Sequence, residues 1–405
     1  MTTYGRSPWI DQFPKSRVPA YPRFRGNPTT DVVVIGGGLT GCATAYAFAA
    51  AGAKVILLEA DRLGGGESGA SAGWISTEPG TPFSQLERAV GAKSAHRAFQ
   101  SWRRAALDFA ALIRRLDIKC SLEPHETILV ARTPEETGRV RREQKARAGA
   151  KLDVRVLNPR AIAEELALAG TIGLRAKEGA TIDPYRATLG LAAAAAARGT
   201  ALFERTPVRR VTFTRKIADV HTASAKIRTG RVIVATGMPT PVFRGLIRHF
   251  WFKTTYMVLT SPVPVKIRRQ LGAGKAIVRD LADPPHMIRR VGEDRLLVMG
   301  ADTPAAPRRQ RDKVIVQRTG QLMYELSTIY PDISGVQPEY GWAADYGLSA
   351  EGIPYIGAHR NYPFHLFAFG DASHSVTGAY LASRIMLRQH LGEMDSADEV
   401  FAFRR

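Results

Sequence analysis

The first 60 residues alternate between short apolar runs and a helix-like segment. Residues 31–35 and 54–59 are largely apolar and rich in Val, Ile and Leu, which is typical of buried strands in a parallel sheet. Between them, residues 39–51 are small and apolar and contain no proline. Gly52 follows at the position where a helix commonly ends in glycine. The pattern therefore predicts a strand, a helix and a second strand in immediate succession.

The rest of the chain predicts α/β segments at both ends and a mainly β block between them. Further helices are expected at 82–116, 134–149, 183–198, 313–330 and 375–391. Further strands are expected at 127–131, 201–204, 208–214, 219–222, 231–235 and 366–370. Within 252–301, runs at 256–260, 287–290 and 295–299 indicate an antiparallel sheet. We predict two domains made of separated segments, with 1–90, 175–245 and 345–405 in one and 91–174 and 246–344 in the other.

A glycine-rich turn lies between the first strand and the first helix. Gly36, Gly38 and Gly41 form a GxGxxG pattern, and Glu59 lies 18 residues after Gly41 at the end of the second strand. The glycines permit a tight turn, close approach of a pyrophosphate and close packing of helix on strand. The free N–H groups at the helix start, around Leu39 and Thr40, favour a phosphate. The spacing predicts a dinucleotide site in which Glu59 binds a ribose. Its negative charge would repel the 2′-phosphate of NADP, which argues against that cofactor.

The segment after Glu59 is unusual for a nicotinamide dehydrogenase. Residues 58–74 read LEADRLGGGESGASAGW, and together with DVVVIGGGLTGCATAYAFAAAG they resemble the FAD-dependent D-amino-acid oxidase superfamily. That superfamily includes glycine, sarcosine and γ-glutamylputrescine-type oxidases. The resemblance implies a Rossmann-type FAD-binding domain with a second, mainly antiparallel β substrate domain. It implies FAD contacts from Ala60, Arg62, Ser68 and Gly73, with Trp74 near the flavin.

Three later blocks extend the resemblance over nearly the whole chain. They are residues 205–237, 341–357 and 364–405, the last containing FAFGDASHSVTG. The further FAD contacts that they imply are Val208, Ala235, Thr236, Gly237, Gly370, Ser375, Val376 and Thr377. Covalently flavinylated members of the superfamily use a downstream cysteine, and no cysteine follows Cys120 here. We therefore expect non-covalent FAD.

Departures from the family pattern concern the substrate. Tyr346 stands where amino-acid-oxidising members often have an arginine for the substrate carboxylate, which favours an amine. Val298 stands where some members have a flavin-facing lysine. The turn 371–377 has side chains where glycines are usual, and we interpret His374 as an exposed loop residue rather than a group at the flavin. The candidate substrate residues are Tyr256, Arg289, Trp342 and Tyr346, with Arg290 as an alternative to Arg289.

Several functions remain open at this point. The first is oxidation of the C–N bond of a small amine or amino acid by hydride transfer to FAD, with O₂ as acceptor and hydrolysis of the imine. The second is a dehydrogenase that passes electrons to another acceptor, and the third is a binding or regulatory protein altered by the 371–377 turn. The fourth is action on an amine attached to RNA.

Composition narrows these alternatives only slightly. Lys and Arg number 57 against 37 Asp and Glu, a formal charge of +20. The basic residues are scattered, which favours a solvated basic surface over nucleic acid or lipid as partner. Two cysteines provide neither a disulfide framework nor a metal site. The charged N-terminus and the glycines that interrupt the longest apolar stretch argue against a signal peptide and a membrane span. We expect a cytoplasmic enzyme without metal.

Overall fold

The computed structural model describes residues 1–405 apart from 215–216, 273, 306–307, 372 and 404–405. The predicted unit at the start of the chain is present as β2 (Thr29–Ile35), α2 (Leu39–Ala50) and β3 (Val55–Leu58). The two strands pair in parallel, with Val32 opposite Val55 and Ile35 opposite Leu58. The prediction from the hydrophobic pattern is confirmed to within two residues at each end.

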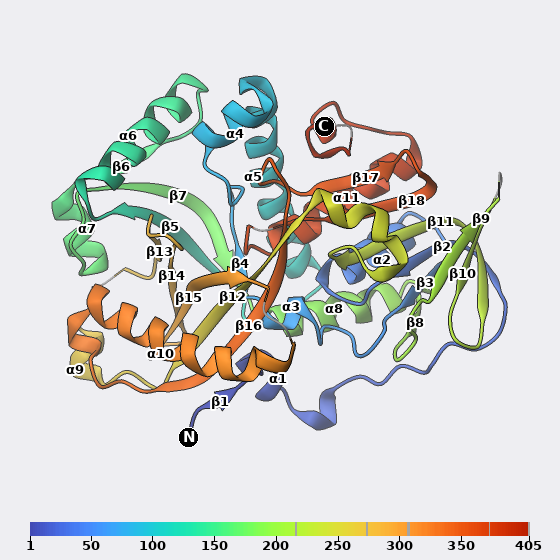
Figure 1. Ribbon diagram of the computed structural model, residues 1–405, viewed down its shortest axis with the longest axis horizontal. Helices are drawn as coiled ribbons and strands as arrows, with labels where there is room; N and C mark the ends of the chain where they lie inside the picture. Colours follow the sequence, from blue (N-terminus) through green and yellow to red (C-terminus); the bar gives the residue numbers. More distant parts are fainter. Residues whose placement is uncertain (215–216, 273, 306–307, 372, 404–405) are drawn as a thin grey trace.

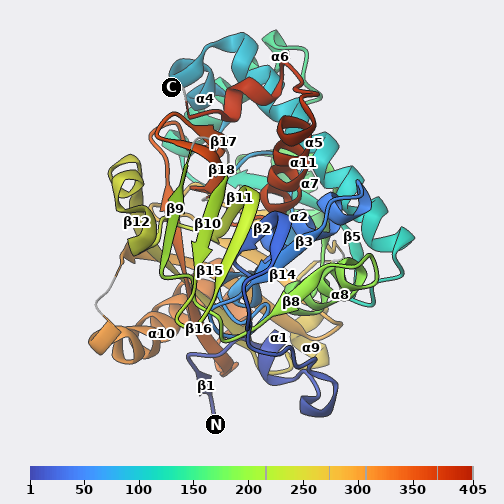
Figure 2. The same cartoon turned by 90° about the vertical axis from the view of Figure 1, so that its right-hand side faces the viewer.

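This unit lies inside an eight-stranded sheet, called here the parallel sheet. Its order is β17-β18-β11-β2-β3-β8, and β10 and β9 extend it from β11 as antiparallel strands. The added strands are β8 (Ala201–Phe203), β9 (Arg210–Phe213), β10 (Ala218–His221), β11 (Lys226–Gly237), β17 (Tyr355–His359) and β18 (Tyr362–Phe369). From β18 to β8 the pairing is parallel throughout, and Figure 2 shows this sheet with β9, β10 and β11 toward the viewer.

Four helices bury one face of the parallel sheet. They are α2, α5 (Ala92–Arg115), α8 (Pro184–Ala196) and α11 (Thr377–Leu391), and their apolar side chains form one cluster with Val32, Val34 and Leu57 of the sheet. The opposite face carries Val33 and Ile56, which pack with Val220 of β10 and with Phe243 of the 3-10 helix η2 (Pro241–His249). The strands of this sheet are therefore buried on both faces, as their continuous apolar runs predict.

The second sheet has ten strands and is mostly antiparallel. Its order is β1-β16-β12-β15-β14-β13-β5-β7-β4, with β6 paired to β7. Its strands are β1 (Thr3–Tyr4), β4 (Trp74–Ile75), β5 (Glu123–Ala131), β6 (Arg155–Leu157), β7 (Ile172–Thr181), β12 (Trp251–Thr260), β13 (Ile277–Arg279), β14 (Met287–Val291), β15 (Arg295–Pro304) and β16 (Pro338–Leu348). Figure 1 shows it with α10 (Arg311–Ile329) beside it, well separated from β9 and β10. The predicted antiparallel block is thus confirmed, although β7 was not predicted.

The two faces of the ten-stranded sheet have different partners. On the outer face, Tyr256 and Val298 pack in one cluster with Leu322 and Leu326 of α10. On the opposite face, called here the inner face, Trp74, Met257, Ile277, Met287, Leu297 and Trp342 form a separate cluster. Consecutive residues such as Tyr256 and Met257 lie in different clusters because side chains alternate along a strand.

Short elements complete the fold. The remaining helices are α1 (Pro8–Asp11), α3 (Glu67–Ala70), α4 (Phe83–Val90), α6 (Pro134–Gly149), α7 (Pro159–Leu166) and α9 (Val265–Arg268). The remaining 3-10 turns are η1 (Lys15–Arg17), η3 (Arg308–Gln310), η4 (Pro331–Ile333) and η5 (Asp398–Phe401). α6 begins at a capping box in which Thr133 and Glu136 each accept a hydrogen bond from the other's backbone N–H.

The chain crosses between the two sheets more often than the predicted domain segments do. β1 and β4 belong to the ten-stranded sheet although both lie within residues 1–90. β7 begins at Ile172, before the predicted boundary at 175, and α5 packs on the parallel sheet although it lies within 91–174. The exact domain limits therefore stay a prediction.

Candidate cofactor and substrate site

The backbone of the turn between β2 and α2 packs so closely on neighbouring main-chain atoms that two of its residues have no room for a side chain. Gly36 has φ +108°, and a Cβ on it would lie 2.6 Å from the Ala235 carbonyl oxygen. A Cβ on Gly41 would lie 1.8 Å from the Gly36 carbonyl oxygen, so the first turn of α2 packs directly on the strand end. Both glycines are needed for the backbone path itself, which has no room for a side chain at either position.

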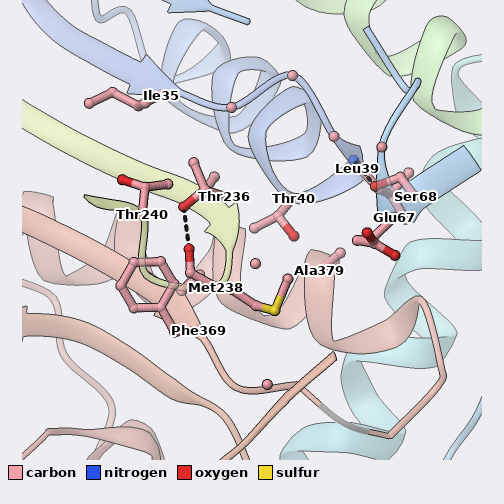
Figure 3. A pocket seen from close by; sticks show the side chains of 18 of the residues that line it. Ile35, Leu39, Thr40, Glu67, Ser68, Thr236, Met238, Thr240, Phe369 and Ala379 are labelled. Carbon is pink, nitrogen blue, oxygen red and sulfur yellow. Dashed lines mark hydrogen bonds between the residues drawn. The ribbon is translucent and has the colours of Figure 1, made fainter. Parts of the chain in front are cut away.

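Two polar side chains organise this turn. The Glu59 carboxylate accepts the Gly37 N–H at 2.6 Å through one oxygen and the Asp61 N–H at 2.8 Å through the other. The Leu39 N–H, at the start of α2, donates to the Ser68 hydroxyl at 2.8 Å. Figure 3 shows Leu39 and Ser68 together at the amino end of α2, with Glu67 beside them. The residues predicted to hold a dinucleotide are therefore brought together around one helix terminus.

A cavity of about 640 Å³ opens over the turn. Its walls come from the loop after β3, the ends of β11 and β18, the start of α11 and the end of β16. The predicted residues that line it are Gly36, Gly38, Leu39, Thr40, Glu59, Ala60, Arg62, Ser68, Val208, Ala235, Thr236, Gly237, Tyr346, Ser375 and Val376. In Figure 3, Met238 extends into this space, and its carbonyl accepts a hydrogen bond from the Thr236 hydroxyl at 2.8 Å.

Five predicted cofactor residues lie behind the cavity wall instead of on it. Gly41 and Gly73 permit close packing, since a Cβ on Gly73 would lie 2.1 Å from the Ile182 carbonyl oxygen. Gly370 has φ +82° and lies against Phe250, and the buried Thr377 hydroxyl donates to the Ser76 carbonyl at 2.8 Å. Trp74 is buried on the inner face. These residues shape the wall without lining the cavity.

Arg62 lines the cavity, and its guanidinium is bound by a buried carboxylate. Its guanidinium forms an ion pair with Glu204 at 2.6 Å, and the Glu204 side chain is only 3% exposed. Glu204 also accepts the Leu63 N–H at 2.9 Å. Arg62 therefore ties the loop after β3 to the strand-end residues of β8.

One part of the cavity wall, called here the polar end, comes from β16 and the loop after β18. Tyr346 and His374 line it, with their rings 4.6 Å apart, and the Tyr346 hydroxyl has no hydrogen-bond partner among the described residues. Lys253 forms an ion pair with Asp302, and its ammonium lies 3.1 Å from His374 Nε2. The interpretation of His374 as an exposed loop residue is wrong, because it is half-buried and lines the cavity. The sequence could not indicate this, because the position of the loop depends on contacts with residues far away in the chain, such as Lys253.

Burial shifts the titration of the groups at this end. It lowers the pKa of His374 to about 3, with the nearby Lys253 charge acting in the same direction. His374 is therefore neutral, and its Nε2 accepts a hydrogen bond from the Lys253 ammonium. Burial also raises the pKa of Asp371 to about 6 and that of Glu67 to about 7, the latter with help from the Asp345 charge. Asp371 and Glu67 line the cavity and were not predicted as site residues.

The other substrate candidates have different positions. Tyr256 lies on the outer face, where its hydroxyl shares a 3.1 Å hydrogen bond with Thr303, and this placement argues against a substrate contact. Trp342 lies on the inner face and donates to the Ala70 carbonyl at 2.7 Å. Arg289 lies on the inner face too and donates to the Ala72 carbonyl at 2.9 Å. Arg290 points to the other side and donates to the Gly272 carbonyl at 2.8 Å.

The residues present fit a flavin dinucleotide. The turn lies at the start of a helix, which is the usual environment of a pyrophosphate. The same cavity is also lined by Thr40, Ala379, Met238 and Tyr346. Within the described residues, no helix is long and apolar enough to cross a bilayer, and no group of three His, Cys, Asp or Glu side chains is arranged to hold a metal ion.

Sequence comparison agrees with this geometry. The family pattern described as FAD dependent oxidoreductase (DAO) matches residues 31–389. The γ-glutamylputrescine oxidoreductase of Escherichia coli K12 is 26% identical over 375 residues, 91% of this chain and 85% of that protein. The glycine oxidase of Bacillus licheniformis is 23% identical over 389 residues, 92% of this chain and 96% of that protein.

Solved structures share the fold. L-amino acid deaminase from Proteus myxofaciens matches with a TM-score of 0.77 and 16% identity, covering 95% of each chain. Glycine oxidase from Geobacillus kaustophilus matches with a TM-score of 0.73 and 20% identity, covering 93% of this chain and 99% of that one. The glycine turn, the cavity and the family match over most of the sequence lead to one conclusion: this chain belongs to the DAO family of FAD-dependent oxidoreductases, and FAD is its cofactor.

Proposed function

We propose that this protein oxidises the C–N bond of a small amine or amino acid with non-covalently bound FAD. The observation that carries the proposal is the continuity of the cavity, which joins the dinucleotide turn at Gly36–Thr40 to a polar end at Tyr346 and His374. The residues of the turn, at the parallel sheet, would hold the nucleotide part of FAD, and Tyr346 of the same cavity belongs to the ten-stranded sheet. The relatives named above, which act on γ-glutamylputrescine and glycine by their names, support an amine or amino acid as substrate.

Non-covalent binding is supported by the positions of the cysteines. Cys42 and Cys120 are both buried, and neither lines the cavity. Burial raises the pKa of the Cys120 thiol to about 12 and raises that of Cys42 as well. A thiol held in this state is a poor nucleophile, because the thiolate is the reactive form.

The proposed reaction requires little acid–base catalysis by the protein. FAD, when bound, accepts a hydride equivalent from the carbon next to the substrate nitrogen, and the imine that forms is hydrolysed in water. The protein's task is to position the substrate and limit water. The neutral His374 and the unpartnered Tyr346 hydroxyl offer hydrogen-bonding groups at the end of the cavity without adding charge there.

The proposal is tested by anaerobic titration of the purified yellow protein with amines, polyamines, and D-, L- and N-methyl amino acids, followed by flavin absorbance. Bleaching by one class of compound is the expected result. Readmission of air then separates the two acceptors, because rapid recolouring indicates O₂ and slow recolouring indicates a dehydrogenase. Yellow protein that no compound bleaches contradicts the proposal and supports the non-catalytic alternative.

A further inference from the structure

The polar end of the cavity is surrounded by negative charge. The four charges that act most strongly on the Tyr346 hydroxyl are all carboxylates, namely Glu67, Asp302, Asp371 and Asp345. Burial, which is the largest cause, and these four charges together raise the pKa of Tyr346 above its usual range. The hydroxyl therefore stays protonated, and the charge at this end is set by the carboxylates and by the cations that neutralise them.

Two of the four carboxylates are neutralised by the protein itself. Lys253 forms an ion pair with Asp302, and Arg311 forms one with Asp345 at 2.7 Å. The other oxygen of Asp345 accepts a hydrogen bond from the Thr254 hydroxyl at 2.6 Å. These two carboxylates therefore have no need of a further partner.

The other two, Glu67 and Asp371, are called here the unpaired carboxylates. Both line the cavity. Glu67 is the first residue of α3 and accepts the Asp345 N–H at the edge of β16 at 2.7 Å, whereas Asp371 accepts the Ser373 N–H at 3.0 Å. Neither forms an ion pair with any residue that the structure describes. A carboxylate held away from water without a cation is costly, so this arrangement suits a cation that comes from outside the chain.

The arginines near the cavity do not supply this cation. Arg209 and Arg244 line the cavity, but one directly precedes β9 and the other lies in η2, on the side of the parallel sheet. Arg279 lies over the Trp74 ring and is not part of the lining. None of the three is among the groups that shift the pKa of either unpaired carboxylate.

Tyr346 gives an independent sign of a missing ligand at the same place. Its hydroxyl is buried and, in the described part of the chain, has no hydrogen-bond partner, which is unusual for a buried polar group. The neighbouring His374 is neutral and does not oppose a cation. An ammonium ion has three N–H donors and no acceptor, so it matches a place that offers carboxylate oxygens and a free hydroxyl oxygen.

We propose that Glu67 and Asp371 bind the substrate as an ammonium ion, so that the oxidised C–N bond belongs to an amine that carries no carboxylate. This inference rests on the proposed function and narrows its substrate class. An alkylammonium ion neutralises part of the excess negative charge at the polar end. An amino acid would bring a further carboxylate into the same place, and the repulsion between like charges would weaken its binding.

The experiment measures binding to the FAD-loaded protein by isothermal titration calorimetry, with four compounds that share a compact branched shape. They are tert-butylammonium, 2-aminoisobutyrate, in which a carboxylate replaces one methyl group, pivalate and tert-butanol. The two amines have no hydrogen on the carbon next to nitrogen, so the flavin cannot oxidise them. We expect tert-butylammonium to bind at least about tenfold more tightly than each of the other three. Equal or tighter binding of 2-aminoisobutyrate, or no binding of tert-butylammonium, overturns the inference.

Glu67→Gln and Asp371→Asn remove the charge but keep an oxygen that can accept the same backbone N–H. We expect each to weaken tert-butylammonium binding about tenfold and to leave tert-butanol binding unchanged. Glu164→Gln is the matched control, because it removes an exposed carboxylate outside the cavity, and it should change neither value.

FAD content and thermal unfolding of each variant establish that it is folded. If one variant fails to fold, the comparison of the four compounds in the wild-type protein and the other variant still decide the question. Unchanged tert-butylammonium binding in a folded variant of either residue overturns the inference.

Substrate kinetics separate this inference from the proposed function. With dimethylamine and sarcosine, which share the oxidised N-methyl group, we expect the KM for dimethylamine to be lower in the wild-type protein and to rise in Asp371→Asn. If neither compound nor the wider panel bleaches the flavin, the proposed function fails while the calorimetry still tests the unpaired carboxylates. If sarcosine is oxidised with a KM equal to or below that for dimethylamine, the proposed function stands and the inference falls.

Discussion

The two ends of the cavity are built by different means. At the nucleotide end, the site consists of backbone, and the glycines at positions 36 and 41 are there because a Cβ would collide with main-chain oxygens. At the substrate end, the site consists of side chains, among them Tyr346 near the end of β16 and His374 in the loop after β18. We expect the nucleotide end to tolerate almost no substitution, because an added side chain would displace the backbone. At the substrate end, a side chain can be replaced without a change of fold. We therefore expect substitutions at the first end to change cofactor binding and substitutions at the second end to change the response to substrate.

The largest effect is expected at Gly41, at the backbone-built end of the cavity. We expect Gly41→Val to lower FAD affinity about 1,000-fold or more, equal to about 4 kcal/mol, because even its Cβ would lie 1.8 Å from the Gly36 carbonyl oxygen. FAD content after purification and fluorescence titration of the apoprotein measure the effect. Gly320→Ala in α10, where nothing lies within 4 Å of the added Cβ, is the control and should bind FAD normally.

The second test concerns the substrate end and pH. Because the pKa of His374 is lowered to about 3 in the folded protein, the unfolded chain takes up this proton first as the pH falls below 6.5. The neutral His374 therefore contributes stability above pH 6.5 that is lost on acidification, by about 1.4 kcal/mol per pH unit down to pH 3.

We expect His374→Asn, which tolerates the positive φ, to remove this dependence, a difference on the order of 3 kcal/mol between pH 7 and pH 4. Urea unfolding of both proteins at each pH provides the measurement. Parallel stability curves for the wild-type protein and the variant would contradict the burial of a neutral imidazole.

A smaller effect is expected where a side chain supports the backbone site. Glu59→Gln should weaken FAD binding about tenfold, because its two carboxylate oxygens each accept one N–H and a glutamine has only one such oxygen. Affinity is again measured by titration of the apoprotein. The exposed Glu164→Gln is the control for loss of a carboxylate, and an equal loss in both variants would argue against a specific role of Glu59.

The smallest effect is expected at Tyr346. Its buried hydroxyl has no partner in the described part of the chain, so Tyr346→Phe should leave FAD binding unchanged and raise the free energy of unfolding by about 1 kcal/mol. The same variant should lower kcat/KM if the hydroxyl contacts substrate. A loss of stability in urea unfolding would show that the hydroxyl has a structural partner.

The sequence predicted the nucleotide end well because its requirements are local. Gly36, Gly38 and Glu59 lie within one strand–helix–strand unit, and their spacing alone indicates how they meet. The substrate end depends on pairings between strands far apart in the chain. Tyr256 was predicted to face the substrate, but it lies on the outer face, and its neighbour Met257 lies on the inner face. Side chains alternate along a strand, so an error of one residue assigns every side chain to the wrong face.

Two further elements were missed for physical reasons. β13 gave no signal because it has only three residues, and its pairing with β14 and β5 holds it as a strand. β7 (Ile172–Thr181) forms the middle of one half of the sheet, yet it contains Arg175, Lys177 and Glu178 and shows no continuous apolar run. Its pairing with β5 stabilises it as a strand in spite of this composition.

The cavity wall is assembled from both ends of the polypeptide, with the turn after Ile35 on one side and residues up to Ala382 of α11 on the other. During synthesis on a ribosome, the N-terminal strand–helix–strand unit emerges long before its C-terminal counterpart. A nascent chain therefore cannot enclose the cofactor until the segment through α11 has been synthesised. A chain that terminates before α11 lacks one side of the binding site.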